Sequence, residues 1–296
     1  MADDKTLGRS LAPGPGPGPA PGAEREAGRP DQRGHAPALA REEPVGDAAV
    51  PRLELASWRE RFGIVAGITT RGRDFSLGLW SEESVAQVMT RWRAVRTTFR
   101  PRFPGLVLAH QVHGTSVAWH AGGAEGWLIG DGQDGHATEV RGLLLTVTVA
   151  DCIPLYLTVP GRPLVALLHA GWRGTAGGIL ARGVELLARH AAVGSADIIM
   201  HCGVGICGAC YEVGSEVLDQ LGPTPAAIGP AVRAGPRGSA HADLRALLAG
   251  QAAALGLGAV SVSPWCSAHD RAQFFSHRAS GGRDGRMIAY LGLPLA

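Results

Sequence analysis

The sequence has very little lysine and no long apolar run. Lys5 is the only lysine among 296 residues, so arginine carries nearly all the positive charge, which we attribute mainly to genome composition. The net charge of +2 is spread over both signs, which excludes the basic stripe that nucleic-acid binding requires. No stretch reaches the roughly 18 apolar residues of a membrane span. We therefore expect partners other than nucleic acid or membrane.

Residues 1–51 contain few large apolar side chains. A Gly-Pro alternation runs from Pro13 to Pro21, with charges of both signs around it. Such a segment cannot bury enough surface to offset the entropy of ordering, so we expect a disordered tail, with an affinity or targeting element as the alternative. It also lacks the apolar stretch of about 7–15 residues that a secretory signal needs. We expect a cytoplasmic protein with one domain over residues 52–296.

Short apolar runs, glycine-rich turns and helical stretches alternate after residue 52. The strands that this pattern predicts cover residues 62–68, 105–110, 143–149, 153–159, 163–169, 198–202 and 260–262. The expected helices cover residues 82–99, 176–190, 213–221 and 242–255. Because strands and helices interleave without a strict βαβ repeat, the pattern predicts an α/β (α+β) fold with a mixed β-sheet and flanking helices.

Three short segments each place a possible metal ligand beside a tight turn. They cover residues 111–114, 150–154 and 169–174. The ligands are His113, Cys152 and His169. Two imidazoles and one thiolate leave a tetrahedral zinc one open position, as in a catalytic site. His110 competes with His113, but on an extended strand it points to the opposite face.

The neighbours of these ligands favour a site over an ordinary structural role. A buried cysteine is usually a small hydrophobe. Asp151 changes this expectation for Cys152, because a carboxylate in an apolar strand needs hydrogen-bond partners or a metal ligand to hold. Arg173 follows His169 in a turn that enters a helix, where guanidinium and backbone N–H groups bind phosphate or carboxylate oxygens. A metal ligand and an anion site are therefore expected to adjoin.

A second group of cysteines gives a weaker signal. Cys207 and Cys210 form one CxxC pair, with His201 and Cys202 just before it. A CxxC pair is a strong indication of a zinc site when a second CxxC pair lies nearby. This sequence has no second CxxC pair in range. We therefore prefer a glycine-rich turn that leads into a helix. The odd number of cysteines, five, still favours reduced thiols and metal ligation over a disulfide framework.

Aromatic and basic residues alternate near the C-terminus, where Phe274 and Phe275 precede Arg278 and Arg286. Such a segment can stack a base and hold phosphate. It can equally be a closing strand with solvated arginines.

Five segments together resemble the laccase-domain family, once called multicopper polyphenol oxidoreductases and since described as purine nucleoside phosphorylases. The segments, in family order, cover residues 111–115, 148–154, 169–175, 210–214 and 274–286. The resemblance implies a single-domain α+β fold with a mixed sheet. It also implies zinc ligands at His113, Cys152 and His169.

The resemblance also implies a reaction. Members of the family act on adenosine, inosine, guanosine and methylthioadenosine by phosphorolysis, and they deaminate adenosine. Bacterial relatives are described as peptidoglycan-editing factors, so an editing hydrolase that uses the same metal is the alternative hypothesis. A zinc-stabilised binding module without turnover is a third. We expect a monomer or weak homo-oligomer that binds purine nucleosides and phosphate.

Several residues match the family outside the metal site. Asp134 matches a family aspartate, and Arg71 matches the arginine of an early Thr-Arg motif. The expected substrate-binding residues are Arg71, Asp134, Arg173, Arg278 and Arg286. Two pairs depart from the family pattern, because Thr-Arg stands at residues 90–91 in place of Asn-Arg and His-Arg stands at 277–278 in place of Arg-Arg.

A copper oxidase needs a type 1 site and several paired histidines for a trinuclear cluster, and this chain has no His-x-His pair. Copper can still occupy the His/Cys/His set adventitiously, but the ligand count excludes laccase chemistry.

Overall fold

The computed structural model describes residues 40–46, 49–79, 83–123, 125–221, 231–235 and 239–296. The expectation of a disordered tail falls largely on residues 1–39, which lie outside the described residues. In the described part, strands and helices alternate as an α/β fold, which confirms the predicted fold class.

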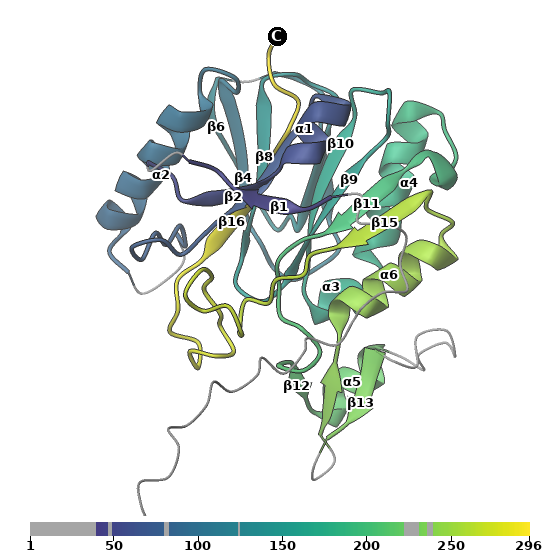
Figure 1. Cartoon of the computed structure of the whole chain (residues 1–296). Helices are drawn as coiled ribbons and strands as arrows, with labels where there is room; N and C mark the ends of the chain where they lie inside the picture. The colour runs from purple at the N-terminus through teal and green to yellow at the C-terminus, as the bar shows by residue number, and fades with distance from the viewer. Residues whose placement is uncertain (1–39, 47–48, 80–82, 124, 222–230, 236–238) are drawn as a thin grey trace, which may run out of the picture. The chain divides into compact units, whose positions relative to one another are not determined.

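Two large mixed sheets form the centre of the fold (Figure 1). The first has the strand order β1-β2-β3-β16-β8-β4-β6. Its strands are β1 (Glu42–Pro44), β2 (Arg52–Leu55), β3 (Val65–Thr69), β4 (Gly105–His110), β6 (Gly126–Asp131), β8 (Leu143–Val149) and β16 (Met287–Gly292). Strand β4 runs parallel to both of its neighbours, whereas β16 runs antiparallel to β3 and β8.

The second large sheet has the order β15-β11-β9-β10-β7-β5. Its strands are β5 (Val117–His120), β7 (Gly135–Thr138), β9 (Ile153–Thr158), β10 (Val165–Ala170), β11 (Ile199–Cys202) and β15 (Ala259–Val262). A small antiparallel sheet adds β12 (Glu212–Val213), β13 (Val232–Ala234) and β14 (Ala240–Ala242). In the described residues, the predicted mixed sheet is present as these two large mixed sheets, with the small antiparallel sheet beside them.

Helices cover the outer faces of the two large sheets, with α2 beside the first sheet and α4 and α6 beside the second (Figure 1). The helices are α1 (Ala56–Phe62), α2 (Val85–Phe99), α3 (Trp172–Ala176), α4 (Ile179–Ala191), α5 (Ser215–Leu221) and α6 (Leu244–Ala254). Among the described residues, no helix has the length and apolar character to cross a membrane.

Strand alternation decides which side chains face which layer. Along β10, Val165 and Leu167 belong to the core cluster that the two large sheets share, whereas Ala166 and Leu168 pack with the residues of α4. Since side chains alternate with a period of two, the next odd position, His169, lies on the face turned toward the first sheet. The sequence thus places a buried histidine at the end of a strand between the two sheets.

Several expected elements have the expected bounds. The strands over residues 105–110 and 143–149 are β4 and β8. The helix expected over residues 176–190 is α4, which covers residues 179–191; the short helix α3 precedes it, and the two are separated by Gly177 and by Gly178, which has a φ of 81°. A left-handed residue interrupts the helix there. Residues 287–292, which directly follow the aromatic and basic C-terminal segment, form the central buried strand β16.

The folded chain begins earlier than the expected boundary at residue 52. Strand β1 pairs with β2, and the side chain of Glu42 is buried. Its carboxylate lies 3.1 Å from His201 Nε2 and accepts a hydrogen bond of 2.9 Å from Ser263 Oγ. The sequence pattern missed this strand because it is only three residues long and consists of two glutamates and a proline.

We expect Glu42→Ala to destabilise the protein by about 1–3 kcal/mol, because it leaves buried polar groups of His201 and Ser263 without an acceptor. Urea unfolding followed by tryptophan fluorescence measures this loss. The matched control is Glu43→Ala on the exposed side of the same strand, which should change stability little. Equal losses in the two variants would contradict the buried role of Glu42.

Candidate metal centre

Three turns meet at one edge of the two large sheets. His113 follows the end of β4, and the turn from Ala150 to Cys152 carries the chain from β8 in the first sheet to β9 in the second. His169 lies near the end of β10, the antiparallel neighbour of β9. All three expected ligands line one cavity of about 440 Å³.

The buried carboxylate of Asp134 holds two of these ligands in place. Its Oδ1 lies 2.9 Å from His169 Nδ1 and accepts a hydrogen bond of 2.9 Å from the backbone N–H of His113. Its Oδ2 accepts from the N–H groups of Gly114 at 2.7 Å and Val112 at 3.3 Å. Since Nδ1 of His169 is engaged, its Nε2 is the nitrogen left to bind a metal.

These contacts also set the charge of Asp134. Burial would raise the pKa of this carboxyl, but hydrogen bonds from His169 and from the backbone N–H of Gly114 hold the pKa below its usual range. Asp134 is fully buried. It therefore faces the ligand histidines rather than the cavity where substrate contact was expected.

Two non-glycine residues at the site have left-handed backbone conformations. His113 has a φ of 59° and Asp151 a φ of 94°. Such conformations persist only where the surroundings impose them. Asp134 holds the first turn. The second is held by the Asp151 carboxylate, which accepts hydrogen bonds from Ser267 Oγ at 2.6 Å and the backbone N–H of Arg278 at 2.7 Å.

The donor set fits zinc. The ligand atoms of His113, Cys152 and His169 all lie within 4.8 Å of one another. Gly171 permits this approach, because a Cβ there would lie 3.0 Å from Cys152 Sγ and 3.1 Å from His113 Cδ2. Two imidazoles and a thiolate suit zinc, and three protein ligands leave one position open.

Electrostatics favour the thiolate that a metal binds. Burial would raise the pKa of Cys152, but the charge of His169 and hydrogen bonds from His113 and His169 lower that pKa to about 6. The pKa of His169 is raised to about 9 against the effect of burial, by the Cys152 thiolate and the hydrogen bond to Asp134. The site therefore stabilises the deprotonated sulfur.

Arginines and aromatic rings line the rest of the cavity. Arg173, Arg278 and Arg286 are among the lining residues. The Arg173 guanidinium lies 4.3 Å from the ring centroid of Trp172, and that of Arg278 lies 4.9 Å from that of Tyr211. The guanidinium of Arg278 also donates to the backbone carbonyl of Glu212. The cavity thus combines a candidate metal centre with cationic and flat surfaces.

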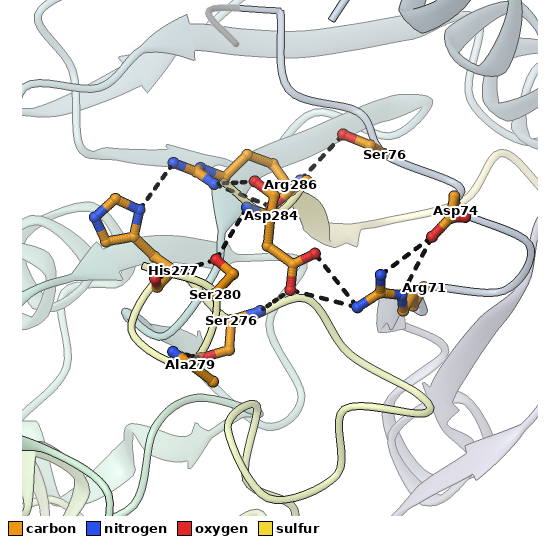
Figure 2. Close-up of polar contacts among 10 residues, drawn as sticks. Arg71, Asp74, Ser76, Ser276, His277, Ala279, Ser280, Asp284 and Arg286 are labelled. Atoms are coloured by element: carbon orange, nitrogen blue, oxygen red, sulfur yellow. Dashed lines mark hydrogen bonds and ion pairs between the residues drawn. The ribbon is translucent and has the colours of Figure 1, made fainter. Parts of the chain in front are cut away.

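Arg71 lies apart from this cavity, in a neighbouring one of about 650 Å³ that shares only Arg286 with the first among their lining residues. Figure 2 shows its guanidinium between two carboxylates, 3.2 Å from Asp74 and 3.3 Å from Asp284. Arg286 is held by the backbone carbonyl of Asp284 at 2.8 Å, and it lies 3.4 Å from His277 Nδ1. Arg71 therefore supports the wall that carries Arg286.

The structure completes the cysteine pair that spacing alone left unpaired. Cys266 and His269 lie beside Cys207 and Cys210, and the four ligand atoms are within 4.8 Å of one another. The preference for a plain glycine-rich turn missed this cluster. The available signal was the Cys-x-x-His spacing of residues 266–269, but nothing in the sequence connected it to a pair 59 residues earlier.

The family profile described as multi-copper polyphenol oxidoreductase laccase matches residues 61–294, so the chain belongs to this family. The crystal structure of YlmD from Geobacillus stearothermophilus is similar with a TM-score of 0.76 at 30% identity, covering 86% of this chain and 99% of that one. Purine nucleoside phosphorylase YlmD of the same organism is 33% identical over 248 residues, which are 78% of this chain and 90% of YlmD.

Two further relatives carry names of enzymes. A purine nucleoside phosphorylase of Deinococcus radiodurans is 40% identical over 191 residues, covering 62% of this chain and 69% of the relative. Adenosine deaminase RL5, from an unknown prokaryotic organism, is 36% identical over 160 residues, covering 53% and 60%.

We expect Cys152→Ala to lower the zinc content of the purified protein by about one equivalent, because the site loses its only thiolate. Elemental analysis by mass spectrometry measures the content. The control is Cys202→Ala, which removes a buried thiol packed in the core beside α6 and should keep the wild-type content. An unchanged content in the Cys152 variant would exclude this residue as a ligand.

Asp134→Asn should weaken zinc binding by about 10- to 100-fold. The amide has only one acceptor oxygen, so it cannot accept the hydrogen bonds from the His169 ring and from the N–H groups of residues 112–114 as the carboxylate does. Competition with a chromophoric chelator gives the affinity. Asp131→Asn is the matched control, because the side chain of Asp131 is exposed and its carboxylate lies 3.0 Å from His110 Nδ1. Equal affinities for Asp134→Asn and the wild type would show that this carboxylate does not support the ligands.

Proposed function

We propose that this chain is a zinc-dependent purine nucleoside phosphorylase that also deaminates adenosine. One observation carries the proposal: a single cavity joins the ligand set of His113, Cys152 and His169 to three arginines and two aromatic rings. The names of the relatives, purine nucleoside phosphorylase and adenosine deaminase, agree with this combination. The proposed substrates are adenosine, inosine, guanosine and methylthioadenosine.

Zinc bound by these ligands would polarise a phosphate oxygen or a water molecule at its open position. Asp134 keeps Nε2 of His169 free for the metal by engaging Nδ1. It is therefore a positioning residue rather than a substrate contact. Asp151 has a related role, because both of its oxygens accept hydrogen bonds and hold the turn before Cys152.

The arginines would bind inorganic phosphate. Charge-assisted hydrogen bonds from guanidinium to phosphate are strong and directional. Arg278 is held in place by the Tyr211 ring and the backbone of Glu212, and Arg286 by the backbone carbonyl of Asp284. Arg173 is exposed at the cavity and can follow the anion.

The aromatic residues would bind the purine. Arg173 lies over the ring of Trp172, and Arg278 lies over the ring of Tyr211. Such stacks offer flat surfaces for a planar base. With the base held there, a phosphate oxygen forms a bond to the ribose carbon while the carbon–nitrogen bond to the purine breaks. The purine leaves with that electron pair and gains a proton.

Deamination would use the same cavity with water in place of phosphate. Water adds to the purine carbon that bears the amine, and ammonia leaves. Both reactions depend on His113, Cys152 and His169, but only phosphorolysis needs the arginines to hold a multiply charged anion.

We expect adenosine with phosphate to yield adenine and ribose 1-phosphate, with slower formation of inosine that needs no phosphate. Chromatography of a nucleoside panel with and without phosphate measures both products. His113→Ala and His169→Ala should abolish both reactions. Adenine release at the same rate without phosphate would contradict phosphorolysis and show that the enzyme hydrolyses the nucleoside instead.

Arg173→Ala should slow the phosphate-dependent reaction by about 10- to 100-fold. This factor corresponds to the free energy of one hydrogen bond to a charged group. It should leave inosine formation less affected. The control is Arg189→Ala on the exposed face of α4, where Arg189 pairs with Glu185. Equal slowing of the two reactions by Arg173→Ala would contradict a phosphate-binding role.

A further inference from the structure

A second set of metal ligands lies outside the His113, Cys152 and His169 site. Cys207 and Cys210 lie in the loop after β11, and Cys266 and His269 lie in the loop after β15. Strands β11 and β15 are parallel neighbours, so both loops leave the same edge of the second large sheet. Their pairing continues past the strands through an isolated parallel bridge between Gly205 and Cys266.

The four ligand atoms of this group all lie within 4.8 Å of one another, with one ring nitrogen of His269 as its ligand atom. His269 lies 3.5 Å from Cys207 Sγ through Nδ1 and 3.2 Å from Cys210 Sγ through Nε2. A tetrahedral zinc at about 2.3 Å from sulfur and about 2.0 Å from nitrogen places its ligand atoms roughly 3.5–3.8 Å apart. The four ligand atoms are therefore close enough together to be drawn around one ion.

The backbone around Cys207 and Cys210 forms a tight turn. The N–H groups of Cys210 and Tyr211 donate to the carbonyl of Cys207 at 3.0 and 3.1 Å. The backbone N–H of Cys207 donates to Cys266 Sγ at 3.3 Å. Such N–H groups stabilise thiolates, the form in which cysteine binds a metal.

We propose that Cys207, Cys210, Cys266 and His269 form a second, structural zinc site. Three thiolates and one imidazole complete a tetrahedron and leave no position for substrate, which is the arrangement of a structural site. A disulfide between Cys207 and Cys210 would use two of the four donors and leave Cys266 and His269 without a role. The inference does not depend on the proposed reaction.

The position of the cluster indicates which part of the structure this zinc would stabilise. Ile206 and Tyr211 flank the CxxC pair, and both line the cavity of the first site. The backbone N–H of Ile206 donates to the carbonyl of Asp151 at 2.9 Å. Ser267, beside Cys266, donates to the Asp151 carboxylate at 2.6 Å. A zinc that joins the two loops would therefore fix the segments that hold the turn before Cys152.

The first test is the zinc content of the full-length protein and of variants with either site removed. We expect about two equivalents in the wild type, about one in Cys152→Ala, about one in the double variant Cys207→Ser with Cys210→Ser, and none when all three changes are combined. Cys202→Ala should keep both equivalents. A wild-type protein with one equivalent, lost in Cys152→Ala and kept in the double variant, would overturn the proposal.

A second measurement keeps all four ligands intact, so it decides even where the double variant fails to fold. Cobalt added to zinc-depleted Cys152→Ala should give a thiolate-to-cobalt charge-transfer band of the intensity of three thiolates, with the visible absorption of a tetrahedral ion. Absence of the band would overturn the site. So would an intact mass of the native protein that is lower by two hydrogens, because a disulfide would then occupy the cysteines.

Discussion

The carboxylate of Asp134 is the contact on which the rest of the site depends. It stands just before β7 in the second sheet, and it binds the turn after β4 in the first sheet as well as His169 on β10. One buried charge therefore joins the two sheets and orients candidate metal ligands from both. Its surroundings compensate its burial with four hydrogen-bond partners, which is what makes a buried ionised carboxylate tolerable.

Long apolar strands could be predicted from the sequence, and short polar ones could not. Strands β8, β9 and β10 are buried along nearly their whole length, so each appears as a continuous apolar run. Strands β5 and β6 are only half-buried and show no such run. Turns at the ends of the buried strands are recognisable as well, which is why the residue pattern alone indicates the His/Cys/His set.

Contacts between segments that are far apart in the sequence could not be predicted from local residue patterns. Residue type indicated that Arg71 is a cation, but not that Asp74 and Asp284 neutralise it. Likewise the pairing of β11 with β15 brings Cys266 and His269 to the CxxC turn, and no local pattern encodes a parallel pairing across that separation. Ligands beside a strand end could be predicted, whereas ligand sets and charge partners assembled by topology could not.

The position of β16 determines when the first sheet can form during translation. It is the last strand in the described part of the chain and lies in the middle of the first sheet, between β3 and β8. On the ribosome, β3 and β8 emerge long before the strand that separates them. The sheet cannot reach its final pairing until translation of the domain is nearly finished. Throughout that interval the turn before Cys152 also lacks the late partners of Asp151, which are Ser267 Oγ and the backbone N–H of Arg278.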